Sequence, residues 1–161
     1  MIQRRKQITP EQALIRLEAT CAASEQSSGE ALEKMRKWGL TPAQAQSVLK
    51  SLINRRFIDD ARFARAYVRD KVRFERRGRL YLRIRLKQKG INDNDIELAL
   101  DEIDPELYSE NLRLTLQRRI EQKDIDLADY PQRMSLLRYA VSRGYEPSPA
   151  AEAIRELASE Q

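Results

Sequence analysis

The sequence predicts an all-α fold, made of three tandem three-helix repeats that form an elongated, curved solenoid-like bundle. The 161 residues include only five glycines and six prolines, and the straight-chain and charged side chains that favour helices dominate. Three segments with one shared pattern are centred on Gly39, Gly90 and Gly144, at spacings of 51 and 54 residues. A further segment with helical periodicity precedes each of them.

The shared pattern is a helix that ends at glycine, a short turn, and a second helix. Glycine ends a helix cheaply because it tolerates left-handed backbone angles. Apolar residues then follow each glycine at a spacing that marks one helix face. These residues are Ala45, Val48, Leu49 and Leu52 in the first segment, Ile96, Ala99, Leu100 and Ile103 in the second, and Ala150, Ala153, Ile154 and Leu157 in the third.

The first helix of each repeat is predicted from residues that favour helix starts. Thr9 and Asp59 can cap exposed N–H groups, while Pro10 and Pro105 suit the first helical position. We therefore expect a basic N-terminal tail at 1–8, followed by repeats at 9–55, 57–103 and 105–159.

The segment "GRLYLRIRLKQKG", from Gly78 to Gly90, allows two interpretations. Its apolar and basic residues alternate, which is typical of a strand. Its counterparts in the outer repeats, "EALEKMRKWG" and "SLLRYAVSRG", do not alternate, so we expect a helix. On that helix Leu82 and Leu86 lie nearly opposite Leu80 and Ile84, which predicts burial on two sides. A strand stays the alternative.

Positive charge is concentrated in the middle of the chain. Residues 55–90 hold fourteen basic and four acidic side chains, although the formal net charge is only +5. This excess predicts a polyanionic partner, and a solvated helix face is the alternative. On an unbroken helix from Asp59, a stripe of arginines lies opposite Phe63, Tyr67 and Phe74. The partner- or phosphate-binding residues that we predict are Arg62, Arg65, Arg69, Arg73, Arg76, Arg77, Arg79, Arg83, Arg85, Lys87 and Lys89.

The residues of catalysis are missing from the sequence. There is no histidine, and the single cysteine, Cys21, has no imidazole to activate it. Asp59 and Asp60 are expected to be helix-start residues rather than a catalytic pair. We predict no catalytic residue, no metal site and no cofactor. One cysteine and no long apolar stretch predict a cytoplasmic protein without a membrane segment.

The run "RRFIDDARFARAYVRDK" followed by "GRLYLRIRLKQKGI" resembles the motif of the bacterial regulatory protein RecX family. Two positions depart from it: Tyr81 stands where family members usually carry arginine, and Arg85 where they usually carry glutamate. The motif residues for which we expect structural roles are Phe57, Ile58, Asp59, Asp60, Phe63, Gly78, Leu86, Gly90 and Ile91.

The resemblance implies a non-enzymatic modulator of the RecA recombinase in DNA repair, recombination and the SOS response. Such proteins lodge in the helical groove of the RecA filament and typically inhibit its ATPase and strand-exchange activities. We expect a monomer whose partner is the RecA filament, with single- or double-stranded DNA as a further candidate. Two alternatives stay open: a stand-alone nucleic-acid-binding module that acts through phosphate contacts, and a structural adaptor.

Overall fold

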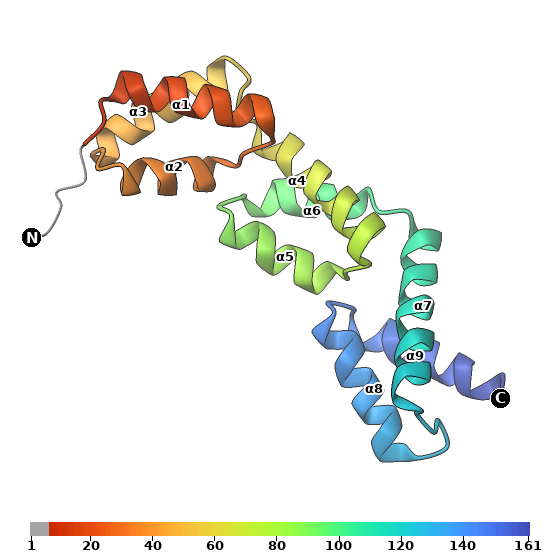
Figure 1. The fold of residues 1–161 in the computed structure, drawn as a ribbon. Coiled ribbons are helices and arrows are strands. Elements are labelled where there is room, and N and C mark those ends of the chain that lie inside the picture. The colour runs from red at the N-terminus through yellow and green to blue at the C-terminus, as the bar shows by residue number, and fades with distance from the viewer. Residues whose placement is uncertain (1–6) are drawn as a thin grey trace, which may run out of the picture. The chain divides into compact units, whose positions relative to one another are not determined.

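The structure, a computed structural model, describes residues 7–161, and within this range every regular element is helical (Figure 1). The predicted all-α class is therefore confirmed. The predicted tail lies outside the described residues except for Gln7 and Ile8. The α-helices are α1 (Pro10–Ala23), α2 (Ser28–Lys37), α3 (Pro42–Asn54), α4 (Asp60–Asp70), α5 (Arg79–Gln88), α6 (Asp93–Asp101), α7 (Pro105–Lys123), α8 (Tyr130–Ser142) and α9 (Pro147–Ser159). A short π-helical turn, η1 (Lys71–Glu75), follows α4.

The helices begin where the cap residues predict. Thr9 and Gln12 form a capping box in which each side chain accepts the backbone N–H of the other residue. Ser27 caps α2 and Thr41 caps α3 in the same way. Asp104 caps α7, and Pro105 takes its first position. These bonds satisfy N–H groups that a helix leaves unpaired at its start.

The three predicted glycine turns all adopt left-handed backbone angles. The φ values are 85° at Gly39, 81° at Gly90 and 103° at Gly144. Such angles strain any residue that has a Cβ atom. The next residue is buried in each case, and it donates its N–H back to the preceding helix. The helix–glycine–helix pattern therefore occurs three times in the described chain.

The described chain separates into two compact units. The first comprises residues up to Ala64 together with Leu86–Ile96, and the second comprises Arg65–Arg85 and Glu97–Gln161. This division runs through α4, α5 and α6, so the boundaries of the three predicted repeats stay a proposal. In the first unit α3 packs against α1 and α2, and in the second unit α7, α8 and α9 pack against one another.

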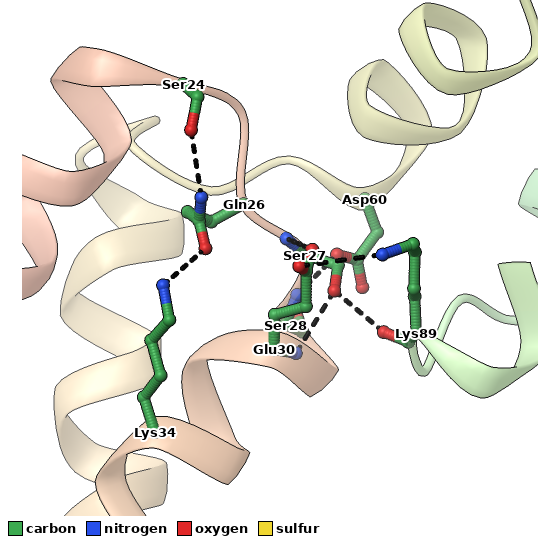
Figure 2. A network of polar contacts seen from close by, with 8 residues as sticks. All are labelled: Ser24, Gln26, Ser27, Ser28, Glu30, Lys34, Asp60 and Lys89. Carbon is green, nitrogen blue, oxygen red and sulfur yellow. Dashed lines mark hydrogen bonds and ion pairs between the residues drawn. The ribbon is translucent and has the colours of Figure 1, made fainter. Parts of the chain in front are cut away.

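In the first unit, the start of α2 approaches the turn after α5 through two glycines. A Cβ atom on Gly29 would lie 2.3 Å from the Lys89 carbonyl oxygen, so only glycine fits there. Ser27 Oγ donates to that same oxygen at 2.7 Å, and Asp60 accepts the Ser28 N–H at 2.8 Å. Figure 2 shows this polar network, in which Glu30 also meets the Lys89 ammonium.

In the second unit, the start of α5 meets the turn before α9 in a comparable way. A Cβ atom on Gly78 would lie 2.2 Å from the carbonyl carbon of Gly144. The Gly78 N–H donates to the Arg143 carbonyl at 3.0 Å, and the Leu80 N–H donates to the Gly144 carbonyl at 2.9 Å. Backbone groups left unpaired at the start of α5 are thereby satisfied.

The segment from Arg79 to Gln88 is a helix, so the strand alternative is wrong. Leu82 and Leu86 are fully buried, but Ile84 is 59% exposed. Burial on two sides, as expected from the alternating pattern, is therefore also wrong. The neighbouring turns contact this segment at its two ends, beside Gly78 and Gly90, and Ile84 lies on its exposed face.

Candidate functional site: an arginine-rimmed groove

The helix that carries the predicted arginine stripe is not continuous. α4 ends at Asp70, and η1 continues the chain with one extra residue in the turn. In this turn Val72 is buried, four residues after buried Val68, while Phe74 is 70% exposed. The expectation of an unbroken helix with Phe74 on its apolar side is therefore wrong.

Side chains from the C-terminal half of the sequence donate hydrogen bonds to this π-helical turn and to the residue that follows it. Asn111, which is buried, donates to the Val72 carbonyl at 3.0 Å, and the Tyr145 hydroxyl donates to the Arg76 carbonyl at 2.6 Å. Arg143 donates to the Glu75 carbonyl. Within the turn, the Lys71 ammonium lies 2.6 Å from the Glu75 carboxylate, and its hydrogen bond lowers the pKa of Glu75. The backbone acceptors at this irregular turn thus have partners.

Five of the predicted binding residues form ion pairs with carboxylates from another segment of the chain. These pairs, each with its nitrogen–oxygen distance, are Arg62 with Glu25 (2.7 Å), Arg79 with Glu146 (3.1 Å), Arg83 with Glu97 (2.7 Å), Lys87 with Asp93 (3.2 Å) and Lys89 with Glu30 (3.7 Å). Arg62 also donates to the carbonyls of Arg56 and Phe57. Because an external anion would have to compete with these partners, the five side chains are less available for binding.

Of three further predicted residues, two lie over an aromatic ring and one is half-buried. The guanidinium carbons of Arg77 and Arg85 lie 4.3 Å and 5.3 Å from the centre of the Tyr81 ring. The tyrosine that departs from the family motif therefore interacts with the arginine that also departs from it. Arg76 is half-buried and ends the π-helical turn in the left-handed region, with φ at 50°.

The remaining three predicted residues, Arg65, Arg69 and Arg73, have exposed side chains. Arg69 lies 4.0 Å from Asp70, too far for a hydrogen bond, and Arg73 lies over the Phe74 ring at 5.3 Å. Within residues 7–161, Arg65 and Arg73 have no ion-pair partner. These three side chains are therefore the best placed of the predicted set to meet an external anion.

The three arginines line one groove of about 530 Å³. We call it the arginine groove; it lies entirely within the second unit. Its apolar lining residues are Val68, Val72, Ala99, Ile103 and Leu107, and its acidic ones are Glu102 and Asp104. The groove thus combines arginines and valines from α4 and η1 with apolar and acidic residues from the α6–α7 region.

The sequence predicts the arginines of this groove as binding residues, and it predicts Ala99 and Ile103 only as part of an apolar helix face. Glu102, Asp104 and Leu107 fall where the second predicted repeat passes into the third, and no motif marks them. The one available signal is an apolar side chain, Leu107, in the first turn of a capped helix, where it is 39% exposed.

The motif residues predicted to be structural lie mainly in the core or at helix starts. Five of them are buried, namely Ile58, Phe63, Gly78, Leu86 and Ile91. Phe57 is partly buried and packs against the core of the first unit, and Gly90 has the positive φ described above. Asp59 accepts the Arg62 N–H at 3.0 Å, and Asp60 accepts the N–H of Ser28. The two carboxylates therefore sit at the starts of two different helices.

No cluster of three or more metal-binding side chains occurs among the described residues. Burial raises the pKa of the Cys21 thiol, so it is not activated as a nucleophile. Over residues 7–161, no helix combines the length and apolarity that a membrane crossing requires.

Similarity to known proteins is found in both the sequence and the fold. The family domain described as "RecX, second three-helix domain" matches residues 59–100. The chain is 33% identical to the regulatory protein RecX of Treponema pallidum (strain Nichols) over 112 residues, which cover 66% of this chain and 68% of the relative. It is also 33% identical to the regulatory protein RecX of Lactobacillus johnsonii over 81 residues. The matched residues make up half of this chain and 30% of that relative, so this chain spans less than a third of the length of the Lactobacillus johnsonii protein.

A solved structure has the same fold. The crystal structure of RecX from Lactobacillus salivarius superposes with a TM-score of 0.81 at 18% sequence identity, covering 94% of this chain and 97% of that one. At this identity the likeness concerns the fold alone.

Proposed function

We propose that this chain, which belongs to the RecX family of regulatory proteins, binds a RecA-type recombinase filament on DNA and modulates its ATPase and strand-exchange activities. The role is non-enzymatic, and inhibition is the direction that the family resemblance implies. The proposal includes the monomeric state and the cytoplasmic location expected from the sequence. It places the protein in DNA repair, recombination and the SOS response.

The observation that carries the proposal is the row formed by Arg65, Arg69 and Arg73. Guanidinium groups form paired hydrogen bonds with carboxylates and phosphates, and these three are exposed rather than used in hydrogen-bonded pairs inside the chain. A recombinase filament on DNA offers both anions. The row also lies within the segment that matches the second RecX domain, residues 59–100.

A charge-reversal experiment tests the proposal. We expect R65E/R69E/R73E to inhibit the DNA-dependent ATPase of a RecA-type recombinase at least about tenfold less effectively than wild type, because attraction is replaced by repulsion. The measurement is a titration of ATPase rate against added protein. Melting curves should stay close to wild type, since exposed substitutions usually change stability by about 0.5 kcal/mol or less each.

The matched control is R118E/R138E/R155E. These arginines are also exposed and lie outside the arginine groove. Because this variant also replaces three arginines by glutamates, it has the same net charge as the first. We expect it to inhibit nearly as well as wild type. A wild-type chain that leaves the ATPase unaffected would contradict the proposed function, and equal losses in both variants would contradict the assignment to this row.

One observation favours a second function, that of a stand-alone nucleic-acid-binding module. Phe74 is 70% exposed beside Arg73, and an exposed aromatic ring next to a cation can stack on a base of single-stranded DNA. This function predicts tight binding of bare single-stranded DNA without inhibition of the recombinase. The same ATPase titration, run beside a DNA-binding titration, separates the two functions.

A further inference from the structure

We propose that the arginine groove binds an amphipathic helical segment of a protein partner, with apolar side chains in the groove and carboxylates on Arg65, Arg69 and Arg73. This inference rests on the proposed function, in which the partner is the recombinase. It goes further because it assigns the groove to protein rather than to DNA phosphate.

The lining of the groove favours a protein segment. Val72 and Ile103 are buried there, while Leu107 is 39% exposed and lies at the start of α7. Because Val72 and Ile103 are already buried, a bound amphipathic helix would remove mainly the exposed part of Leu107 from water, and this burial favours its entry into the groove. A phosphate backbone has no apolar side chain to place there. The volume, about 530 Å³, has room for a few side chains.

The charges of the groove point the same way. Glu102 and Asp104 line it together with the arginines and would repel a phosphate chain. Asp104 accepts the Glu106 N–H at 3.0 Å, which fixes its carboxylate at this end of α7. A protein segment can present carboxylates toward α4 and η1 and neutral or basic side chains toward Glu102 and Asp104. Charge complementarity therefore selects a segment with acidic residues along one edge of its apolar face.

The spacing of the arginines suits a helix. Arg65 and Arg69 are four residues apart on α4, about 6 Å along its axis, and Arg73 follows four residues later on η1. Acidic side chains three or four residues apart on a partner helix recur at about the same interval. Arg73 is also exposed and lines the groove beside buried Val72, whose carbonyl accepts the Asn111 amide.

Overlapping peptides of the cognate recombinase, each about 15 residues long, provide the test. Binding of fluorescent peptides to the full chain is measured by fluorescence polarisation. We expect the binding peptides to combine apolar and acidic residues. We expect L107Q to weaken their binding about tenfold, because it removes apolar contact from the groove. The control L98Q changes a leucine that is 57% exposed on α6 outside the groove, and it should bind like wild type.

A charge swap gives a second measurement that does not depend on the leucine. Arg69→Glu should weaken peptide binding, and lysine in place of one acidic residue of the peptide should restore it. Circular dichroism melting curves check that the variants are folded. If Leu107→Gln does not fold, Arg69→Glu takes its place in the peptide-binding measurement.

The possible outcomes separate this inference from the proposed function. If L107Q inhibits the ATPase normally and no recombinase peptide binds, the groove assignment is wrong and the proposed function stands. If L107Q or R69E instead abolishes binding of a single-stranded DNA oligonucleotide, the groove binds DNA and the inference is overturned. If the wild-type chain does not inhibit the recombinase, the proposed function fails and the inference fails with it.

Discussion

Tyr108 lies in a half-buried polar cluster of the second unit. Its hydroxyl donates to Glu146 and accepts the Arg79 N–H at 3.1 Å, and the Arg79 guanidinium lies 4.0 Å from the ring centre. Burial, together with the hydrogen bond to Glu146, raises the pKa of Tyr108 well above the ordinary tyrosine value. The protonated hydroxyl thus joins the starts of α5, α7 and α9.

This pKa shift predicts a loss of stability in alkali. Because the folded pKa is raised, the stabilisation is complete below the unfolded pKa of about 10 and is lost as the pH rises toward the folded pKa. Urea unfolding at pH 8 to 11 should show a steeper loss for wild type than for Tyr108→Phe. The variant should also be about 1–2 kcal/mol less stable at pH 8. Equally steep losses in both proteins would contradict the assignment.

Pairs of glycines set how closely helix starts and helix ends approach one another. Gly29 faces the Lys89–Gly90 turn in the first unit, and Gly78 faces Gly144 in the second. The neighbour is backbone in both cases, so no rotation of a side chain can make room. By contrast, Gly39 faces the side chain of Gln7, whose amide donates to the Gly39 carbonyl at 2.9 Å. Some of the described glycines therefore allow left-handed turns, and some allow backbone segments to approach closely.

Gly29→Ala should destabilise the protein although it lies inside α2. Alanine normally stabilises a helix by about 0.5–1 kcal/mol over glycine. Here the added methyl group would overlap the Lys89 carbonyl, so we expect a net loss of about 1–3 kcal/mol in urea unfolding. Asn94→Ala, at the equivalent second position of α6, is exposed and should cost little. A stabilised Gly29→Ala variant would show that the approach is looser than described.

Charge is distributed unevenly over the whole molecule. The net charge of +5 combines a strongly basic middle segment with an acidic remainder. Many of the basic side chains in that segment are already paired with carboxylates elsewhere in the chain, so the total charge overstates the attraction available to a partner. Association should therefore depend on where the exposed side chains of Arg65, Arg69 and Arg73 lie.

Salt dependence measures this directly. Raising NaCl from about 0.05 to 0.5 M shortens the screening length and should slow association of the wild-type chain with recombinase filaments about tenfold. R65E/R69E/R73E should show a much weaker dependence. R118E/R138E/R155E should keep the wild-type slope in stopped-flow or surface-binding kinetics. A flat response in both variants would mean that total charge, not the arginine row, steers association.

The helices and their ends could be predicted from the sequence because the interactions that define them are local. The Thr9 cap and Gln12 are three residues apart, and the glycine turns act on the helix that precedes them. The same locality made Arg65, Arg69 and Arg73, which follow one another at four-residue intervals, recognisable as a row. The motif residues that fill the core could likewise be recognised from periodicity and family resemblance.

Only the tertiary structure decided which of the basic residues stay available and where the helix changes its geometry. Glu25, Glu97 and Glu146 pair with arginines that lie 14 to 67 residues away in the sequence. Asn111 and Tyr145 reach the turn at Lys71–Glu75 across 39 and 69 residues. Helical periodicity fixes only neighbours within about one turn of the chain. Ion pairs, a π-helical turn and a groove depend on side chains that folding brings together from distant segments, and so no local pattern predicts them.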